Sequence, residues 1–346
     1  MASSKDMPPV TAGPVSMFLK NQFFTTLPRT PKATQLHGHT ALVTGPSSGL
    51  GLESARQLLA LGLSHLVIAV RSPERGNAAA AALRAANPGA RVDVWALEME
   101  SYASVRALVQ RCATELARID MAVLNAGVAE VEFCLVASTG HEKTMQVNYL
   151  STVLLVVLLL PVLKAKASTG APARITVVNS MMSEFAKFAN RDKRPLLGSF
   201  DDTKVTPWDP SERYNVTKLL GQMFLSRLAD EIAPEDAIIN MVEPGLVKGT
   251  GLFSNLHGIA GVVFGLIKSA SARTAEEGAL TYIDAVAVKG KKSHGSFIVN
   301  CKIHPLATIT YKAETKAVAD QLWEETLDEF RFADARGILR SVSKQV

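Results

Sequence analysis

A tyrosine and a lysine with the spacing of a proton-transfer pair lie in the segment SERYNVTKLLGQMF, residues 211–224. They are Tyr214 and Lys218, four positions apart. On a helix, residues at this spacing lie one turn apart on the same face, where an ammonium group can act on a phenol. The spacing also occurs by chance in chains with many lysines, so by itself it is a weak signal. The surrounding sequence has to decide between a catalytic pair and two ordinary helix residues.

The residues before the pair indicate the start of a helix. Asp209 is of a type preferred at the N-cap, and Pro210 is favoured at the first helical position. The helix would hold Tyr214 and Lys218 near its start, beside a strand that ends at Ser180. This context favours the catalytic interpretation of the pair.

A glycine-rich turn, VTGPSSGLG at residues 43–51, follows an apolar strand and opens a helical pattern. Gly45 permits a sharp turn, and Gly49 and Gly51 allow backbone amides at the helix N-terminus to approach a pyrophosphate. Such turns also serve simply as loops, but the flanking strand and helix favour phosphate binding. The sequence therefore predicts a dinucleotide site at this turn.

The end of the second strand, AVRSPERG at residues 69–76, bears on which dinucleotide binds. Enzymes that prefer NAD usually place a carboxylate here to bind the ribose hydroxyls. This chain has Val70 followed by Arg71, whose guanidinium can pair with a 2′-phosphate, and Arg75 offers a second charge. Either arginine is also compatible with a solvated loop position. For Arg75, the loop position and the binding role fit the sequence equally well. We expect NADP(H) rather than NAD(H).

Short apolar runs alternate with longer helical patterns from residue 37 onwards. Several runs are apolar on successive residues, as strands buried on both faces must be. The alternation favours right-handed crossovers and one doubly wound, parallel sheet of about seven strands. The predicted strands are residues 40–45, 65–70, 91–98, 121–127, 174–180, 237–245 and 296–300. We expect one α/β domain over residues 37–346, preceded by an N-terminal arm over residues 1–36.

Six motifs in their order resemble those of the short-chain dehydrogenase/reductase family, over roughly residues 37–335. They are TGPSSGLG in the first turn, LNAG at 124–127, NYLS at 148–151, VVNS at 177–180, RYNVTK at 213–218 and EPGLVKGTGL at 243–252. The chain is most similar in character to retinol-dehydrogenase-like members and their relatives in fungal secondary metabolism. The resemblance implies a single-domain Rossmann fold and an oxidoreductase that transfers a hydride between a nicotinamide and a carbonyl or alcohol.

The resemblance also implies the catalytic residues. Tyr214 would be the general acid or base, and the Lys218 ammonium would lower a tyrosine pKa that is ordinarily about 10. Lys218 would also bind the nicotinamide ribose, and Ser180 would hydrogen-bond to the substrate carbonyl and polarise it. Asn148 would hold a water that extends a proton relay to Lys218, with local helix capping as its alternative role.

The remaining residues implied by the resemblance surround the cofactor. Asn125 and Gly127 would line the cleft after the fourth strand, and Val247 would meet the nicotinamide amide. Leu50 would offer its backbone to the pyrophosphate, and Glu98 would stand near the adenine. The full set of predicted cofactor residues is Gly45, Ser48, Gly49, Leu50, Gly51, Arg71, Arg75, Glu98, Asn125, Gly127, Tyr214, Lys218 and Val247.

Several features depart from the family pattern. Glu98 replaces the usual aspartate, Leu124 replaces the common first asparagine of the Asn-Asn-Ala-Gly turn, and the threonine expected after Pro244–Gly245 is displaced to Thr250. The stretch between the serine and the tyrosine is longer than is common in the family. Its aromatic residues form either a substrate wall or a small satellite core, and both interpretations stay open: Phe185, Phe188, Phe200 and Trp208.

An apolar, glycine-interrupted segment follows the sixth strand at residues 246–274. It is placed at the carboxyl end of the sheet, where open α/β folds bind their ligands. Its large apolar side chains are too many to stay exposed together: Phe253, Leu256, Val263, Phe264 and Leu266. We favour a mobile lid over an apolar substrate, with a permanently packed helix pair and membrane contact as the alternatives.

The overall composition is that of an ordinary soluble globular protein. The 346 residues are 47% hydrophobic and 20% charged, and we interpret the net charge of +5 as scattered solvated charge, with no nucleic-acid partner. Three widely spaced cysteines predict no disulfide framework, and seven histidines without ligand spacing predict no metal site. We expect a cytoplasmic protein, and the oligomeric state stays open.

Two apolar stretches raise the question of a membrane. YLSTVLLVVLLLPVL, residues 149–163, falls short of the roughly 20 residues that span a bilayer and is predicted to be a buried helix. VSMFLKNQFF, residues 15–24, is compatible with membrane contact, but we favour an arm packed on the protein body. The expected function is an NADP(H)-dependent oxidoreductase acting on an apolar small molecule, such as a ketoreductase of secondary metabolism. A membrane-associated retinol-dehydrogenase-like enzyme and a non-catalytic NADP-binding protein are the alternatives.

Overall fold

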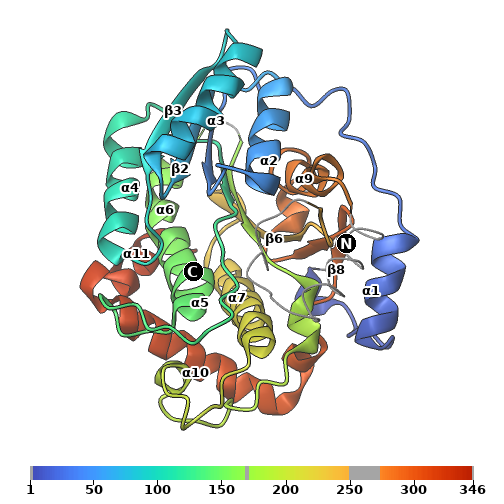
Figure 1. Cartoon of the computed structure of the whole chain (residues 1–346), viewed down its shortest axis with the longest axis vertical. Helices are drawn as coiled ribbons and strands as arrows, with labels where there is room; N and C mark the ends of the chain where they lie inside the picture. The colour runs from blue at the N-terminus through green and yellow to red at the C-terminus, as the bar shows by residue number, and fades with distance from the viewer. Residues whose placement is uncertain (1–2, 168–170, 249–272, 345–346) are drawn as a thin grey trace.

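The computed structural model describes residues 3–167, 171–248 and 273–344 (Figure 1). The predicted lid falls almost entirely outside these residues, together with its large apolar side chains and Thr250. The lid therefore stays a prediction.

One eight-stranded sheet forms the centre of the fold, with the strand order β3-β2-β1-β4-β5-β6-β7-β8. All neighbouring strands are parallel except β7 and β8, which are antiparallel. The strands are β1 (Thr40–Thr44), β2 (His65–Val70), β3 (Arg91–Ala96), β4 (Met121–Leu124), β5 (Ala173–Val178), β6 (Ala237–Glu243), β7 (Phe297–Val299) and β8 (Lys302–His304). The predicted α/β fold with a doubly wound sheet is confirmed, and the sheet is parallel as predicted except for the added strand β8.

The eighth strand is a feature that the sequence analysis missed. It follows β7 through a tight turn at Asn300 and Cys301, both of which have positive φ values, of 51° and 60°. Glycine is the usual sequence signal for such a hairpin turn, and a cysteine in this position gives none. The seven predicted strands are all present, most of them a few residues shorter than expected.

Helices cover both faces of the sheet. They are α1 (Pro14–Phe23), α2 (Gly49–Ala60), α3 (Pro73–Ala86), α4 (Tyr102–Glu115), α5 (Lys143–Met145), α6 (Thr152–Lys166), α7 (Pro210–Glu231), α9 (Ala275–Ile283), α10 (Ala313–Glu329) and α11 (Ala335–Val342). Side chains of α2, α3 and α9 pack into one apolar cluster, and those of α4, α6, α7, α10 and α11 into another. Alternate residues of β1 face the two sides: Leu42 joins one cluster, and Ala41 and Val43 join the other.

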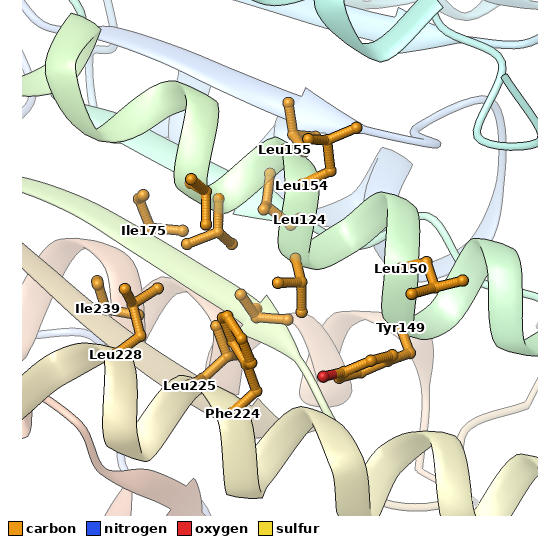
Figure 2. Packing of buried hydrophobic residues seen from close by; sticks show 14 of the residues in the cluster. Leu124, Tyr149, Leu150, Leu154, Leu155, Ile175, Phe224, Leu225, Leu228 and Ile239 are labelled. Carbon is orange, nitrogen blue, oxygen red and sulfur yellow. The ribbon is translucent and has the colours of Figure 1, made fainter. Parts of the chain in front are cut away.

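Helix α6 crosses the larger cluster, as Figure 2 shows from close by. Leu154 and Leu155 of α6 belong to the same cluster of buried side chains as Ile175 of β5 and Phe224 of α7. The continuous helical stretch Lys143–Lys166 is long and apolar enough to cross a membrane, but 89% of its most apolar window is buried inside the protein. The helix is longer than the sequence analysis expected, so its burial, and not its length, identifies it as the predicted buried core helix.

The segment predicted as an amphipathic arm contains helix α1, which packs on the protein body. Met17 is buried in the larger apolar cluster, and Gln22 is buried beside the loop that follows β6. The opposite side of the helix exposes apolar side chains: Val15, Leu19, Phe23 and, just beyond its end, Phe24. Figure 1 shows α1 at one edge of the molecule, on the side of β8.

The strand order reverses between β1 and β4. From β1 the chain moves outward to β2 and β3, and from β4 it moves outward in the other direction. At such a switch point the loops beyond the carboxyl ends of the two strands turn to opposite faces and leave a crevice for a ligand. The glycine-rich turn after β1 and the loop after β4 both lie at this crevice.

Candidate active site

Tyr214 and Lys218 lie in the first turns of α7, as the sequence predicts. Asp209 caps the helix, since its Oδ1 accepts hydrogen bonds from the amides of Ser211 at 2.9 Å and Glu212 at 3.0 Å, and Pro210 is the first helical residue. Both side chains of the pair are buried, and the Lys218 Nζ lies 5.5 Å from the centre of the Tyr214 ring. The predicted one-turn arrangement is confirmed.

Ser180 brings a second hydroxyl to Tyr214. It follows the end of β5 and is only 9% exposed, and its hydroxyl is hydrogen-bonded to the Tyr214 phenol. Its Oγ also accepts a hydrogen bond from the amide of Met182, which lies in the short helical turn Met181–Phe185. The carboxyl end of β5 and the start of α7 therefore meet at these two hydroxyls, and the catalytic roles of Ser180 and Tyr214 stay a prediction.

The electrostatics of the pair differ from the prediction. Burial raises the pKa of Tyr214 above its ordinary value, the charge of Glu243 raises it further, and the Ser180 hydrogen bond opposes both. The raised pKa is opposite to the lowering predicted from Lys218, whose Nζ donates to the carbonyl oxygen of Val178, at 3.0 Å. Burial lowers the pKa of Lys218 to about 8, against the influence of Glu243. In this arrangement the phenol is held protonated and is ready to act as an acid.

Asn148 lies in a π-helical stretch, Gln146–Ser151, that precedes α6. Its Oδ1 accepts from the amide of Val128 at 2.8 Å, and its Nδ2 donates to the Val128 carbonyl oxygen at 2.8 Å and to Thr217 Oγ1 at 3.3 Å. π-Helical turns occur often at functional sites. The side chain thus ties the loop after β4 to α7, and the predicted water relay to Lys218 stays a prediction.

The glycine-rich turn has the backbone that the sequence predicts. Gly45 and Gly49 have φ values of +69° and +57°, which residues with a Cβ rarely adopt. Helix α2 starts at Gly49, and its N-cap residue Ser48 makes no side-chain hydrogen bond to the helix amides. The Ser48 side chain therefore does not cover the amides around Leu50 at this N-terminus, where the helix dipole favours an anion. A pyrophosphate fits this turn.

Gly51 has a packing role in addition to the one predicted for it beside the pyrophosphate, which stays a prediction. A Cβ at this position would lie 2.6 Å from Asn125 Nδ2. That Nδ2 donates to the carbonyl oxygen of Thr44 at 3.0 Å, and the amides of Asn125 and Ala126 donate to Thr44 Oγ1 at 2.9 and 3.0 Å. Gly51 is therefore needed for close packing of α2 on Asn125, which joins the ends of β1 and β4.

Tyr282 of α9 is a neighbour of the site that the sequence analysis missed. Its hydroxyl donates to Asn125 Oδ1 at 3.2 Å, and its side chain is 1% exposed. Burial raises its pKa well above the ordinary value, with further contributions from Tyr214 and Glu243. No local pattern relates α9 to the loop after β4, because the contact joins residues 157 positions apart.

Arg71 lies at the end of β2, with its side chain 57% exposed. It has a partner that the sequence analysis did not foresee: Glu100, from the loop after β3, lies 3.8 Å away. Glu100 is also 3.3 Å from Lys143, and its amide donates to Glu98 Oε1 at 3.1 Å. Arg75 is exposed in the first turn of α3, where its amide donates to Ser72 Oγ. An acidic and a basic group thus face each other where the 2′-phosphate is expected.

The side chains of Val247 and Leu50 both lie against Gly278 of α9. A Cβ on Gly278 would lie 2.7 Å from a methyl carbon of each residue, so both side chains pack directly on α9. Val247 is 3% exposed and forms a β-bridge with Arg273. Gly127 is exposed, and a Cβ there would lie 3.2 Å from Asn148 Oδ1. These predicted cofactor residues therefore gather around the same crevice.

The most important residue that the sequence analysis missed is Glu243. It is the last residue of β6 and 7% exposed, and its carboxylate accepts hydrogen bonds from the amides of Met181 at 2.7 Å and Gly245 at 3.1 Å. The Ser180 hydroxyl is a third partner. Burial raises its pKa, and these hydrogen bonds oppose the rise. The available signal was a charged residue at the end of a strand that is otherwise largely apolar.

The aromatic residues between Ser180 and α7 divide into two groups. Phe188 and Phe200 are buried in the larger apolar cluster, so they belong to the core and not to a substrate wall. Trp208 is partly exposed and donates through Nε1 to the carbonyl oxygen of Val131, and its ring packs edge-on against Phe133. Phe185 is also partly exposed. For Phe185 and Trp208, the predicted alternative of a substrate wall therefore stays open.

The sequence is similar to known proteins over its whole length. Residues 39–190 match the protein family described as short chain dehydrogenase. The chain is 46% identical over 343 residues to the short chain dehydrogenase/reductase mfmJ of Annulohypoxylon moriforme, covering 99% of each chain. It is 38% identical over 350 residues to the short-chain dehydrogenase fogG of Aspergillus ruber, covering 99% of this chain and 100% of that protein.

The fold is similar to solved structures of bacterial proteins. A short-chain type dehydrogenase/reductase from Mycobacterium marinum superposes with a TM-score of 0.60 at 19% identity, covering 81% of this chain and 98% of that one. An NADPH-bound short chain oxidoreductase from Pseudomonas aeruginosa PAO1 has a TM-score of 0.56 at 22% identity, with coverages of 79% and 97%. At these identities the likeness concerns the fold alone.

Proposed function

Since the chain belongs to the short-chain dehydrogenase/reductase family, we propose that it is an NADP(H)-dependent enzyme that interconverts a carbonyl group and an alcohol on an apolar small molecule. Its full-length relatives are fungal proteins. A ketoreductase of fungal secondary metabolism is the form of this activity that we propose, acting as a soluble cytoplasmic enzyme.

The contact between the Ser180 and Tyr214 hydroxyls, one helical turn from Lys218, carries this proposal. Two hydroxyls that meet at the carboxyl end of the sheet can both reach one oxygen atom of a substrate bound in the crevice. Tyr214 is held protonated by its surroundings, which suits the reducing direction. A purely structural site would have no need of three buried polar groups gathered at the open edge of the sheet.

In the reducing direction, a nicotinamide held in the crevice would supply the hydride that the carbonyl carbon accepts. Tyr214 donates its phenolic proton to the carbonyl oxygen as negative charge develops there, and the Ser180 hydroxyl hydrogen-bonds to the same oxygen. The positive charge of Lys218, whose Nζ is bonded to the Val178 carbonyl oxygen, stabilises the tyrosinate that remains. In the oxidising direction, tyrosinate accepts the alcohol proton.

Two features support NADP(H) as the cofactor. Arg71 at the end of β2 is exposed enough to pair with a 2′-phosphate, and the N-terminus of α3 begins beside it at Pro73. The nearby Glu100 is offset by Lys143, at 3.3 Å. The glycine-rich turn and the N-terminal amides of α2 would hold the pyrophosphate.

The proposal is tested by mixing the full-length protein with NADPH and a panel of apolar ketones and following the loss of NADPH absorbance. The Tyr214→Phe variant serves as the matched control for background oxidation. We expect turnover of at least one ketone by the wild type and none by the variant. Tight NADPH binding without oxidation on any ketone, and without reduction of NADP⁺ by the matching alcohols, would instead support a non-catalytic NADP-binding protein.

The exposed apolar side of α1 favours one variation of this function, an enzyme that works at a membrane surface. Flotation of the protein with liposomes distinguishes the two forms. Absence from the liposome fraction is expected for the soluble enzyme. Flotation that is lost in a Leu19→Ser, Phe23→Ser variant would assign the membrane contact to α1.

A further inference from the structure

Glu243 is a buried carboxylate at the catalytic centre with no part in the mechanism described so far. Its position at the end of β6 lies next to the end of β5, which carries Ser180. Oε2 accepts from the amide of Met181, directly after Ser180, and Oε1 accepts from the amide of Gly245. One side chain therefore holds both the catalytic serine segment and the Pro244–Gly245 turn that leads to Val247.

The charge of this side chain is costly, and the backbone contacts alone do not account for it. Burying an ionised carboxylate costs several kcal/mol unless charges and hydrogen bonds compensate. An amide side chain of the same shape can accept a hydrogen bond from a backbone amide without that penalty. Glu243 has the additional partners that an anion requires: the Ser180 hydroxyl and the positive charge of Arg273.

Ser180 links this carboxylate to the proton donor. A hydroxyl has one proton and two lone pairs, and an ionised carboxylate can only accept. The single proton of Ser180 can go to Tyr214, which lowers the Tyr214 pKa, or to Glu243. When Ser180 donates to Glu243, its oxygen is left to accept the proton of Tyr214. The O–H of Ser180 then points to Glu243 and a lone pair of its oxygen faces Tyr214, until a substrate oxygen arrives and the O–H rotates to it. Glu243 remains bonded to the two backbone amides in that step.

We propose that Glu243 is a positioning residue of the carbonyl-reduction reaction, which fixes the Ser180 hydroxyl and places a negative charge beside Tyr214 and Lys218. The proposal rests on the function proposed above. A negative charge disfavours tyrosinate and favours the lysine ammonium, so it keeps Tyr214 protonated and Lys218 positively charged.

The other charged and titratable groups around this centre are few among the described residues. Lys218 comes from α7, Tyr282 from α9, and Arg273 from the segment before α9, where Glu277 also acts on Arg273. Because Glu243 acts on Tyr214, Lys218 and Tyr282 alike, its removal shifts the titration of the whole centre.

The test compares Glu243→Gln, which removes the charge and keeps an acceptor oxygen, with Glu243→Asp, which keeps the charge on a shorter side chain. Glu235→Gln makes the same chemical change at an exposed position and is the matched control. For carbonyl reduction, kcat/KM is measured as a function of pH. We expect its alkaline limb in E243Q to shift to lower pH by about one unit, because the pKa of Tyr214 falls when the negative charge is removed. In E243D the limb should stay in place while kcat falls, and E235Q should match the wild type.

A second measurement is independent of turnover. The titration of tyrosinate is followed by near-ultraviolet absorbance in E243Q with and without Tyr214→Phe, so that the difference reports on Tyr214 alone. The pKa of Tyr214 is expected to be lower in E243Q than in the wild-type protein. This readout still applies if no ketone is turned over, in which case the proposed function fails but the inference about Glu243 can stand.

Three results would overturn the proposal. One is a lower kcat in E243Q with an unmoved pH profile and an unmoved Tyr214 titration, which would make Glu243 merely structural. Another is wild-type kinetics and titration in E243Q. If E243Q does not fold, the proposal is decided by E243D, and wild-type kcat in that variant would contradict it.

Discussion

Gln22 of the N-terminal helix binds both backbone polar groups of Leu246. Its Nε2 donates to the Leu246 carbonyl oxygen at 3.0 Å, and its Oε1 accepts from the Leu246 amide at 3.0 Å. Arg273 supports the same region, donating to the carbonyl oxygens of Pro244 at 3.2 Å and of Asn21 at 2.8 Å. The arm therefore holds the turn that precedes Val247, beside the site expected for the nicotinamide.

We expect Gln22→Ala to destabilise the protein by about 1–3 kcal/mol, because it leaves an amide and a carbonyl of Leu246 without their partner. The NADPH dissociation constant should rise several-fold as the turn before Val247 loosens. Urea unfolding and a fluorescence titration with NADPH measure the two effects. Gln35→Ala, at an exposed position in the same arm, is the control and should leave both unchanged. An equal effect of the two substitutions would contradict a specific role of Gln22.

Tyr214→Phe should reduce turnover by at least about 10²-fold, because general acid catalysis contributes roughly 10²–10⁴-fold. NADPH affinity should be nearly unchanged, since the phenol contributes little to binding the adenine half of the cofactor. Steady-state kinetics and NADPH titration check both points. Tyr102→Phe, which removes a hydroxyl bonded to Glu329 and distant in sequence from the motifs, should retain wild-type kinetics. A Tyr214→Phe variant that keeps more than about a tenth of the wild-type rate would show that another group supplies the proton.

Arg71→Ala should weaken NADPH binding by about ten- to a hundredfold and NADH binding much less, since only NADPH carries a 2′-phosphate. Glu100→Gln should strengthen NADPH binding modestly, because it removes the acidic group 3.8 Å from Arg71. Dissociation constants for the two cofactors in each variant provide the measurement. Equal losses of NADPH and NADH affinity in the Arg71 variant would assign Arg71 a structural role.

Gly51→Ala should destabilise the protein by about 1–3 kcal/mol, because the added methyl group would lie 2.6 Å from Asn125 Nδ2 and force the side chain off the end of β1. Gly89→Ala is the matched control, since a Cβ there has no atom within 4 Å. Thermal unfolding of both variants compares them directly. If both variants unfold at the wild-type temperature, the close packing of α2 on Asn125 is not needed for stability.

Stability should fall as pH rises through about 9 because of His141. Burial would lower its pKa, but hydrogen bonds and charges of Asp201 and Glu329 raise it to about 9. A histidine whose pKa is raised on folding contributes stability that is complete below its unfolded pKa of about 6.5 and is lost as pH rises through the folded value. We expect the contribution to be on the order of 1–3 kcal/mol.

Urea unfolding of the wild type and His141→Gln at pH 6 and pH 10 tests this expectation. The wild type should exceed the variant in stability at the lower pH and lose most of that advantage at the higher pH. A constant difference between the two proteins would show that His141 does not titrate in this range.

Much of the fold could be predicted because its signals are local. Strands buried on both faces must be apolar on successive residues, so β1, β2 and β5 were found from their composition alone. The helical period placed Tyr214 and Lys218 on one face, and Asp209 and Pro210 marked the start of α7. The family and its fungal relatives were likewise predicted from motifs that each occupy a few consecutive residues.

The tertiary structure decided which distant residues share the site. Gln22 reaches Leu246 across 224 positions, Tyr282 reaches Asn125 across 157, and Glu243 meets the Ser180 segment across about 60. No period or spacing encodes such contacts, because they depend on which ends of the strands the sheet brings together. Burial decided the rest: it determined that Phe188 and Phe200 belong to the core, and it raised the pKa of Tyr214 where the motif alone predicted a fall. Local sequence specifies the elements, and the energy of a buried charge or hydroxyl is determined only when the fold has closed around it.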